Sequence, residues 1–311
     1  MTVDIGRVPR QGQLAYFIEQ ACHTAPMPTA IVHPVDPNSL QAACEAHERG
    51  LISAILVGPE ARIRDTAKTL ELPIDTLRIV DTEHSHAAAA KACALVHAGE
   101  ARALMKGGLS TDEFLGAILH REYGIRTDRR LSHLFIFDVP SYPKPLFLSD
   151  AAINIQPDLE IKKDIVQNAI DFCRSLGISQ PKVAILAAVE KVNPKMQSTL
   201  DAAALCKMAE RGQIQGGLLD GPLALDNAIS REAAEDKHIH SAVAGDVDIL
   251  IAPDLEAANM LGKQLIYLAG AQSAGVVLGA RVPLILTSRA EKTQGRLASC
   301  ALASLFMQAE Q

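Results

Sequence analysis

Short apolar runs alternate with longer, periodically apolar stretches almost throughout the chain. The first four runs predict buried strands at Thr29–Val35, Leu51–Val57, Leu77–Val80 and Ala101–Met105. The stretches between them, in which apolar residues recur every three or four positions, predict helices at residues 39–49, 60–70 and 85–97. Strands joined by helices form right-handed crossovers, so the pattern predicts a mainly parallel sheet that helices cover on both faces.

The alternation of apolar runs and amphipathic stretches is interrupted after Gly124. A polar stretch, GIRTDRR, precedes two apolar runs, LSHLFIFDV and PLFLSD, which only a short Pro-rich connection separates. Because that connection is too short for a crossover helix, the two strands are predicted to pair antiparallel. We place a domain boundary near Thr127.

Beyond this pair the alternation of strands and helices resumes. The predicted helices are Asp158–Leu176, Pro194–Arg211, Asp254–Ala269 and Ala290–Gln308. The predicted strands are Lys182–Ala187, Gly216–Asp220, Asp248–Ala252, Val276–Leu278 and Leu284–Leu286. The pattern therefore predicts a second α/β region after the boundary.

The composition narrows the class of protein. The chain has 311 residues, of which 48% are hydrophobic, enough for one large or two medium globular domains. A net charge of −6, without any long run of Lys or Arg, argues against nucleic-acid binding. The first residues lack the apolar segment of a secretory signal, and no apolar run reaches the about 18 residues of a membrane span. Six scattered cysteines without a Cys-x-x-Cys pair predict reduced thiols and a cytoplasmic location.

A Gly-rich turn follows the predicted strand Ala101–Met105. Lys106, Gly107 and Gly108 come directly after that strand, and Ser110 or Thr111 is placed to cap the next helix. Backbone N–H groups, a helix N-terminus and an ammonium group together suit a phosphate. A tight glycine turn with a solvated lysine is the competing interpretation.

A second polar strand end lies in LLDGPLALDNAIS. It contains Asp220 and Pro222, followed by Asp226 and Asn227 in a predicted short helix. Structural roles are available, because Pro suits the first helical position and Asp suits a helix cap. Two acids and an amide at one strand end favour a pocket somewhat more.

Two further strand ends carry polar side chains. Lys191 and Asn193 follow the strand Lys182–Ala187, while Asn259 and Lys263 lie four residues apart and so share one face of a helix. A solvated helix face is the simpler interpretation of the second pair.

Three histidines, His84, His86 and His97, could suggest a metal site. Neither carboxylates nor cysteines accompany them at ligand spacing, so we expect no metal site here. His84 and His86 are better explained as the solvent-facing start of a helix.

The strand Leu284–Leu286 ends on Thr287, Ser288 and Arg289. An arginine at a strand end can hold phosphate or carboxylate through its planar fork, and Ser288 adds a donor at a helix N-terminus. Ser288 could equally cap the last helix while Arg289 lies on the surface. No histidine is near Ser288 in the sequence, so a serine ester is not expected.

These motifs, in this order and spacing, resemble one known family. KVNPKMQST, LLDGPLALDNAIS, AGDVDILIAPDLEAANMLGK and PLILTSRA are similar to segments of the phosphate acetyl/butyryltransferases, also called phosphotransacylases. MKGGLST, RLSHLFIFD and FLSDAAIN are similar too, so the resemblance runs from about Ala101 to the C-terminus. TSRA and DGPLALDNA look more like the butyryl branch, which favours a longer acyl group over acetyl.

The resemblance implies an activity and a fold. The activity is the reversible exchange of acyl-CoA and phosphate with acyl phosphate and CoA, with no permanently bound cofactor or metal. The fold consists of two α/β domains with mainly parallel sheets, like those of isocitrate and isopropylmalate dehydrogenases, with the active site in the interdomain cleft. Residues 1–127 plus 275–311 would form the first domain and 128–274 the second, and a homodimer is expected.

The resemblance also implies roles for residues. Ser288 is similar to a serine near the CoA sulfur, and Arg289 to an arginine that holds the phosphoryl group while the CoA thiolate attacks the acyl phosphate directly. The acetyl branch has an aspartate after this pair that is absent here, which leaves Glu291 and Asp226 as candidate bases. The expected substrate-binding residues are Lys106, Gly107, Gly108, Thr111, Lys191, Asn193, Asp220, Pro222, Asn227, Asn259, Lys263 and Thr287.

Two other functions remain open from the sequence. One is a metal-dependent hydroxyacid dehydrogenase of the same fold, which would need clustered aspartates and an arginine-rich substrate site. The other is a catalytically inactive regulator that binds acyl-CoA or acyl phosphate, an interpretation that the missing aspartate keeps open.

Overall fold

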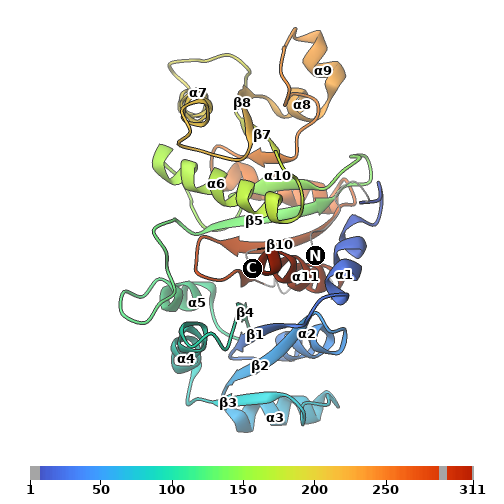
Figure 1. Ribbon diagram of the computed structural model, residues 1–311, viewed down its shortest axis with the longest axis vertical. Helices are drawn as coiled ribbons and strands as arrows, with labels where there is room; N and C mark the ends of the chain where they lie inside the picture. Colours follow the sequence, from blue (N-terminus) through green and yellow to red (C-terminus); the bar gives the residue numbers. More distant parts are fainter. Residues whose placement is uncertain (1–7, 287–292, 310–311) are drawn as a thin grey trace. The chain divides into compact units, whose positions relative to one another are not determined.

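The computed structural model describes residues 8–286 and 293–309, which form two compact units. Unit 1 comprises Leu14–Arg129 and Ala274–Gln311, and unit 2 comprises Arg130–Ser273 together with the N-terminal stretch that ends at Gln13. Each unit contains strands with helices around them (Figure 1). The predicted α/β class with mainly parallel pairing is confirmed in both units.

The described residues of unit 1 form six strands in the order β3-β2-β1-β4-β11-β10. The strands are β1 (Met27–Val32), β2 (Ile52–Gly58), β3 (Arg78–Asp81), β4 (Ala103–Lys106), β10 (Gln272–Leu278) and β11 (Leu284–Ile285). All neighbours pair parallel except β10 and β11, which form an antiparallel pair. The helices are α1 (Gln13–Cys22), α2 (Pro37–Glu48), α3 (Glu60–Thr69), α4 (Ser85–His97), α5 (Thr111–Ile118) and α11 (Thr293–Ala309).

The direction of winding reverses beside β1. The chain runs outward through β1, β2 and β3, and then α4 returns it to β4 on the other side of β1. Helices α4 and α5 lie on one side of these strands and α2 on the other (Figure 1). The loops after β1 and β4 therefore lead to helices on opposite faces, which is where open α/β sheets bind ligands.

Within the part of unit 2 that the structure describes there are five strands, in the order β5-β6-β9-β7-β8. They are β5 (Ser132–Asp138), β6 (Leu146–Ser149), β7 (Lys182–Leu186), β8 (Leu218–Leu223) and β9 (Ile249–Ile251). The predicted antiparallel pairing of β5 with β6 is confirmed, and the remaining pairs are parallel. The helices are α6 (Leu159–Ser175), α7 (Gln197–Glu210), α8 (Leu225–Ile229), α9 (Arg231–Asp236) and α10 (Leu255–Tyr267).

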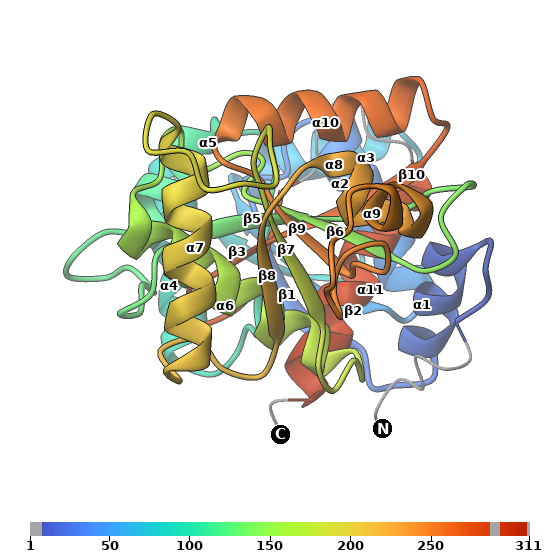
Figure 2. The same ribbon diagram turned by 90° about the horizontal axis from the view of Figure 1, so that it is seen from above.

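Helices also diverge from the carboxyl ends of neighbouring strands in unit 2. The chain enters α7 after β7 and α8 after β8, and Figure 2 shows α7 on one side of these two strands and α8 with α9 on the other. The loops after β7 and β8 therefore separate, as they do after β1 and β4 in unit 1. This geometry again places a candidate ligand site at the carboxyl ends of the strands.

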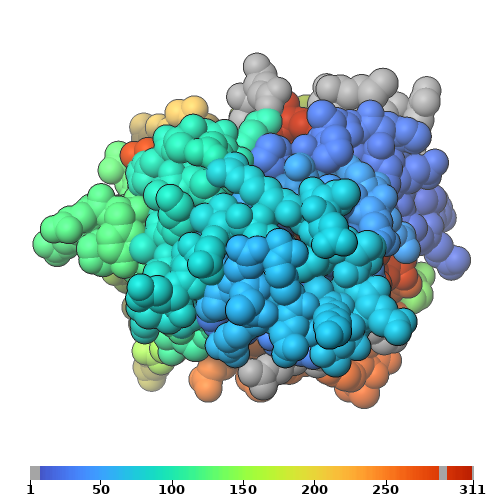
Figure 3. Space-filling model, turned by 90° about the horizontal axis from the view of Figure 1, so that it is seen from below, coloured from blue at the N-terminus to red at the C-terminus, as the bar shows by residue number. Residues whose placement is uncertain are grey.

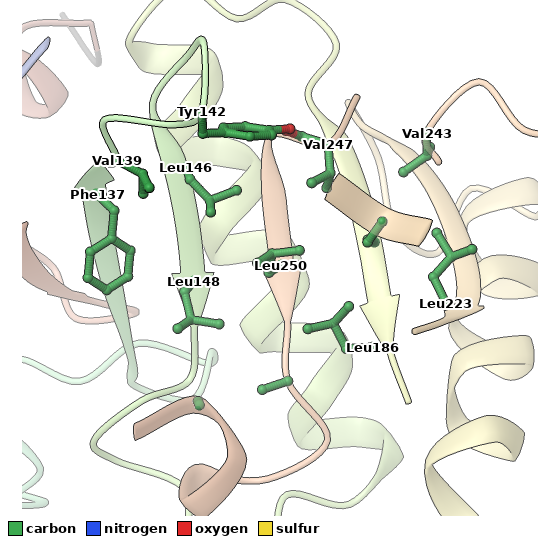
Figure 4. Packing of buried hydrophobic residues seen from close by; sticks show 14 of the residues in the cluster. Phe137, Val139, Tyr142, Leu146, Leu148, Leu186, Leu223, Val243, Val247 and Leu250 are labelled. Carbon is green, nitrogen blue, oxygen red and sulfur yellow. The ribbon is translucent and has the colours of Figure 1, made fainter. Parts of the chain in front are cut away.

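An aliphatic core anchors the strands of unit 2 (Figure 4). Leu148, Leu250 and Leu186 project from β6, β9 and β7 into one buried cluster. At its rim the Tyr142 hydroxyl donates to the carbonyl oxygen of Val247 at 2.6 Å. Burial raises the pKa of Tyr142 above its ordinary value, so this hydroxyl stays protonated as a donor.

Polar residues that precede helices accept hydrogen bonds from the first turn. Asp36 caps α2, His84 caps α4 and Ser110 caps α5 in unit 1, while Asp158 caps α6 and Asp254 caps α10 in unit 2. The His84 Nδ1 atom accepts from the N–H of Ala87 at 3.1 Å, which confirms that this histidine starts a helix. Each cap satisfies an N–H group that the helix leaves without a partner.

One strand is longer than the sequence predicted. The expected strand Gly216–Asp220 is shifted, because β8 runs to Leu223, which pairs with Leu186 across a register shift. Asp220 and Pro222 therefore lie within a strand, so the alternative structural roles that the sequence offered, a helix cap and a first helical residue, do not apply. Proline is tolerated there because β8 is at the edge of the sheet, where its missing N–H breaks no ladder bond.

One face of unit 1 is strongly polar. Figure 3 shows the surface built around α3 and β3, where Arg64 pairs with Glu60 and Arg78 with Glu100, each at 2.7 Å. None of the large apolar side chains exposed within the described residues falls between positions 50 and 100. This face is therefore solvated, and its exposed ion pairs contribute little to stability.

Across the described part of the chain, no helix has both the length and the apolar character that crossing a bilayer requires.

Candidate functional site

The carboxyl end of β1 is held in an uncommon backbone conformation. His33 follows β1 with φ of 58°, in the left-handed region that residues other than glycine rarely adopt. Its N–H donates to the carbonyl of Val57 at 2.7 Å, and its own carbonyl accepts from the N–H groups of Val35 and Gly108 at 2.9 and 2.8 Å. Contacts to the ends of β2 and β4 thus fix His33, and such strained positions concentrate at functional sites.

The His33 ring is buried beside these strand ends. The residue is 6% exposed, and its Nδ1 atom has no hydrogen-bond partner in the described structure. A β-carbon at Gly58 would lie 3.3 Å from the Cα atom of His33, a tight contact, and 3.6 Å from Nδ1, an ordinary one, so the end of β2 packs closely against this residue. Burial and the nearby Arg62 cation lower the pKa of His33, which the carboxylates of Glu113 and Asp36 oppose. The imidazole is therefore neutral at pH 7.

The Gly-rich turn after β4 is bonded to the chain after β1. The N–H of Gly107 donates to Val32 O at 2.9 Å, and the N–H of Gly108 donates to His33 O at 2.8 Å. A β-carbon at Gly107 would lie 2.5 Å from Val32 O, so only glycine fits there. These two N–H groups are therefore already engaged, although the sequence suggested them as donors to a phosphate.

Lys106 folds back over the same turn. Its Nζ donates to the carbonyl oxygens of Gly107 and Leu109 at 3.2 and 2.9 Å. Ser110, rather than Thr111, caps α5 by accepting from the N–H of Glu113. The ammonium group thus lies at the carboxyl edge of the sheet, close to the N-terminus of α5.

β11 brings the chain to the same edge of unit 1. It pairs parallel with β4 and ends at Ile285 opposite Met105, one residue before Lys106. The four residues that follow and carry the central predictions lie outside the described residues: Thr287, Ser288, Arg289 and Glu291.

A buried carboxylate organises the loop after β6 in unit 2. Asp150 Oδ1 accepts from the N–H groups of His133, Ala152 and Ile153 at 3.0, 3.1 and 3.2 Å. Its Oδ2 accepts from both the backbone N–H and the side-chain Nδ2 of Asn154, at 2.9 and 2.6 Å. Five donors satisfy this carboxylate, which explains the SDAAIN motif as the frame of a loop at the carboxyl edge of the sheet.

His133 lies beside this loop with an unsatisfied ring. It is 5% exposed, its Nδ1 has no partner among the described residues, and its ring meets Phe135 edge-on at 4.5 Å. Burial lowers the pKa of His133 to about 4, an effect that the Asp150 charge opposes. His133 is therefore neutral at physiological pH.

The DGPLALDNA motif divides into differently placed side chains. Asp220 is half-buried in β8, where its Oδ1 accepts from the N–H of Gly221 at 2.8 Å. Asp226 in α8 is 57% exposed and lies 3.4 Å from Lys237 Nζ. Asn227 is fully buried, yet neither its Oδ1 nor its Nδ2 has a partner in the described structure. A buried amide without partners is rare in proteins and calls for an explanation.

The loop after β7 is built around Asn193. Its Oδ1 accepts from the N–H of Lys195, and its backbone N–H donates to Thr199 Oγ1, both at 2.9 Å. Lys191 is exposed in the same loop. Glu190, just before it, pairs with Lys237 Nζ at 3.1 Å, so Lys237 connects this loop to α8.

Asn259 and Lys263 lie on α10, as the sequence predicted. Asn259 Nδ2 donates to the carbonyl oxygen of Ala151 at 3.2 Å, which joins α10 to the loop after β6. Lys263, one turn further, is exposed. The interior side of this helix is at Gly262, where a β-carbon would lie 3.4 Å from Phe137.

The structure thus gathers most of the predicted residues at strand ends within each unit. In unit 1, the turn that follows Lys106 is bonded to the chain at His33 through Gly108. In unit 2, the predicted residues follow the ends of β7, β8 and β9, except Asp220 and Pro222, which lie within β8. Sequence reasoning gave no role to His33, His133, Asp150 or Lys237. A histidine directly before Pro34 at a strand end was the available signal for His33. The burial of His133 and Asp150, and the two ion pairs of the exposed Lys237, follow only from the fold.

Comparison with known proteins identifies the family. Residues 85–304 match the family model described as "Phosphate acetyl/butaryl transferase". A phosphate acetyltransferase from Rhizobium meliloti is 57% identical over 93% of this chain and 92% of its own. The chain belongs to the phosphate acetyl/butyryltransferase family.

Other relatives bear on the branch of this family. A phosphate butyryltransferase from Clostridium beijerinckii is 43% identical over 89% of this chain and 91% of its own. Because the acetyltransferase from Rhizobium meliloti is more similar, the predicted lean toward the butyryl branch is not confirmed.

Solved structures support the fold. A branched-chain phosphotransacylase from Enterococcus faecalis superposes with a TM-score of 0.78 at 30% identity, covering 90% of this chain and 99% of that one. A 4-hydroxythreonine-4-phosphate dehydrogenase from Klebsiella pneumoniae matches with a TM-score of 0.58 at 13% identity, over 91% of this chain and 100% of its own. The expected dehydrogenase-like fold of this transferase is thereby confirmed.

Proposed function

We propose that this phosphate acyltransferase transfers acetyl, converting acetyl-CoA and phosphate to acetyl phosphate and CoA, and the reverse. The observation that carries the choice of acyl group is the 57% identity to the Rhizobium meliloti phosphate acetyltransferase over nearly the whole of both chains. The comparisons do not favour a hydroxyacid dehydrogenase or a regulator without catalysis.

The proposed chemistry needs no covalent enzyme intermediate. In the synthesis of acetyl-CoA, the CoA sulfur attacks the carbonyl carbon of acetyl phosphate, and the carbonyl electrons move to oxygen. The C–S bond is then complete, the carbonyl re-forms, and the bond to the phosphate oxygen breaks with both electrons leaving on phosphate. Fixed donors that face the transient oxyanion, together with correct positioning of the two substrates, lower the barrier.

We assign the central steps to the segment that follows β11. Ser288 lies near the sulfur in this proposal, and Arg289 holds the phosphoryl group through its fork. A free thiol has a pKa of about 8.5, so a base assists its ionisation near neutral pH. Glu291 and Asp226 are the two candidates, and Asp226 lies 3.4 Å from Lys237 Nζ.

The remaining assignments concern substrate binding. The proposal keeps Lys106, Gly107 and Gly108 at the carboxyl edge of unit 1, where the glycines shape the turn and the lysine supplies charge. In unit 2, Asn227 is supported most strongly, because its amide is buried without a partner among the described residues. The full set of proposed substrate-binding residues also includes Thr111, Lys191, Asn193, Asp220, Pro222, Asn259, Lys263 and Thr287.

We further propose a homodimeric cytoplasmic enzyme that uses CoA or acyl-CoA and phosphate as substrates and holds no permanent cofactor. Six cysteines without a disulfide among the described residues are compatible with a reducing compartment. Burial raises the pKa of the Cys44 and Cys93 thiols to about 11, which leaves both unreactive and consistent with structural roles.

The test of the proposed function is a chain-length series. Purified protein is mixed with phosphate and acetyl-, butyryl- or isobutyryl-CoA, and a thiol-reactive dye follows release of CoA. We expect kcat/KM to be highest with acetyl-CoA, without added metal or nicotinamide. A preference for butyryl-CoA would overturn the acyl assignment, and no CoA release with any substrate would overturn the activity.

The two candidate bases are separated by pH–rate profiles. Asp226→Asn and Glu291→Gln each remove one carboxylate, and only the variant that lacks the base should lose the low-pH limb of kcat/KM. Trapping an acyl-serine in the wild-type protein would contradict direct attack by the thiolate.

A further inference from the structure

One arginine in unit 1 has hydrogen-bonding capacity that the described residues do not use. Arg296 lies in the first turn of α11, and its Nε is buried without a hydrogen-bond partner in the described structure. Its Nη1 donates to the carbonyl oxygen of Asn38 at 3.4 Å, which is a long hydrogen bond. A guanidinium has five N–H donors, so most of this group is left for another acceptor.

Nothing in the described part of the chain neutralises this cation. Among the described residues, no carboxylate forms an ion pair with Arg296 within 4.0 Å. Structural arginines that are partly buried are ordinarily paired, because an unpaired charge is costly to remove from water. The absence of a partner among the described residues points to an anion that comes from outside the protein.

The position of Arg296 connects it to the carboxyl edge of unit 1. Asn38 is in the first turn of α2, which directly follows β1 and His33. A β-carbon at Gly108 would lie 3.0 Å from Asp36 Oδ2, so the start of α2 touches the turn that carries Lys106. Arg296 therefore reaches the same edge of the sheet from the helix that succeeds the Ser288–Arg289 segment.

Positive partial charges and one carboxylate lie around Arg296. The N-termini of α2 and α11 place positive partial charges here. Asp36 is the nearby carboxylate, and its Oδ1 and Oδ2 already accept from the N–H and hydroxyl of Ser39 at 3.1 and 2.5 Å. An added anion could therefore accept hydrogen bonds from Arg296, whose Nε has no partner among the described residues. The Asp36 oxygens already accept hydrogen bonds from Ser39.

We propose that Arg296 is a substrate-binding residue that grips a phosphate group through its guanidinium fork. The inference rests on the proposed function, because every substrate of that reaction carries at least one phosphate group: CoA, acetyl-CoA, acetyl phosphate and inorganic phosphate. Planar, bidentate hydrogen bonding to phosphate is the interaction for which arginine surpasses lysine. The phosphate belongs either to CoA or to the acetyl phosphate and inorganic phosphate pair, and the experiment distinguishes these sources.

Two variants of Arg296 and one control test the proposal. Arg296→Gln removes the charge and keeps much of the length, whereas Arg296→Lys keeps the charge and loses the fork. Arg49→Gln removes the same charge from an exposed residue at the opposite end of α2. Melting temperatures within a few degrees of wild type establish that each protein is folded.

Calorimetry then measures ligand binding by each variant, and initial rates measure its activity. Dissociation constants are measured for CoA, for dephospho-coenzyme A, which lacks the ribose phosphate, and for inorganic phosphate. We expect Arg296→Gln to weaken one of these ligands by about tenfold to a hundredfold, in line with the loss of a charge-assisted hydrogen bond. Arg296→Lys should fall between that variant and wild type, and Arg49→Gln should match wild type.

The pattern of losses names the phosphate. Weaker CoA with unchanged dephospho-coenzyme A assigns the ribose phosphate, weakening of both assigns the pyrophosphate, and a selective loss for inorganic phosphate assigns the transferred group. Binding of all three ligands within twofold of wild type in Arg296→Gln overturns the proposal. If Arg296→Gln does not fold, the same criterion applied to Arg296→Lys decides.

The proposed function can fail separately. Wild-type protein that binds CoA but releases none from acyl-CoA and phosphate would contradict the activity, while the binding comparison still tests Arg296. Wild-type protein that binds neither CoA nor phosphate would overturn both proposals.

Discussion

The N–H of Gly107 donates to the carbonyl oxygen of Val32 at 2.9 Å, and that same oxygen would lie 2.5 Å from a β-carbon at position 107. The turn after β4 can therefore approach β1 only with glycine at this position. The contact joins the strand that leads to His33 with the strand that leads to Lys106, so the geometry of the whole carboxyl edge depends on it.

Gly107→Ala should displace this edge of unit 1. A contact below 3 Å with backbone atoms cannot be relieved by rotating a side chain, so β1 and β4 must separate or the turn must change. We expect a loss of about 2–4 kcal/mol in the free energy of unfolding, typical of severe overpacking, and a loss of most activity. Urea unfolding and initial rates provide the measurements.

Gly116→Ala is the matched control for that substitution. Gly116 is exposed in α5, and a β-carbon there meets nothing within 4 Å. Alanine favours a helix over glycine, so this variant should gain about 0.5–1 kcal/mol and keep its activity. Equal destabilisation by both substitutions would contradict the role of the Val32 contact.

His33 provides a test that separates backbone strain from side-chain function. Because its φ is 58°, His33→Gly should preserve or increase stability, whereas His33→Ala keeps a β-carbon in the strained conformation and should be the less stable of the two by about 1 kcal/mol. If the ring itself serves the reaction, both variants should lose kcat/KM to a similar extent. Activity that follows stability alone would show that only the backbone conformation matters.

His133 should make the protein sensitive to mild acid. Its pKa is lowered by burial to about 4, against about 6.5 in the unfolded chain, so only the unfolded state takes up a proton between these values. Stability is therefore unaffected above pH 6.5 and falls as the pH decreases toward 4, by up to about 3 kcal/mol. Chemical denaturation at a series of pH values measures this slope.

His133→Phe removes the titrating group while keeping an aromatic ring against Phe135. We expect a shallower decline in stability between pH 6.5 and 4 in this variant. An unchanged slope would mean that another group, and not His133, controls the acid response.

Asn227 is expected to lower the stability of the protein while serving substrate binding. Its amide is fully buried, and neither polar atom has a partner in the described structure, so the nearly isosteric Asn227→Leu should raise the free energy of unfolding by about 1 kcal/mol. The same substitution should lower kcat/KM if the amide meets the substrate. A less stable variant would indicate that a buried water already satisfies the amide.

A buried ion pair joins α6 to α7 and should be sensitive to loss of one partner. Lys162 Nζ lies 2.7 Å from Asp201 Oδ2, and the two side chains are 6% and 9% exposed. Lys162→Met leaves a buried carboxylate whose Oδ1 still accepts from Gln197, and should cost about 3–5 kcal/mol. Adding Asp201→Leu should recover much of that loss in a double-mutant cycle, and additive losses would contradict the pairing.

The alternation of apolar runs and amphipathic stretches determined most of the elements. It predicted the parallel strands β1 to β4, the long helix α6 and the antiparallel pair β5–β6, because those signals are local: hydrophobic periodicity and the length of a connection. It missed α1 and α9, and it gave no sign that β10 and β11 pair antiparallel. Short elements depend on their neighbours for stability, so their own residues carry a weak signal.

The sequence by itself also placed polar residues such as Lys106 and Asn227 at strand ends, since a strand followed by glycine, proline or a polar residue is visible in one dimension. Only the tertiary structure decided what each side chain does there. Asp150 accepts five hydrogen bonds, the N–H of Gly107 already donates to Val32 O, and Arg296 keeps donors that no described residue uses. The sequence distinguishes none of these outcomes. Hydrogen bonds and burial depend on which distant segments the fold brings within a few ångströms, and that information is absent from the order of residues along a strand.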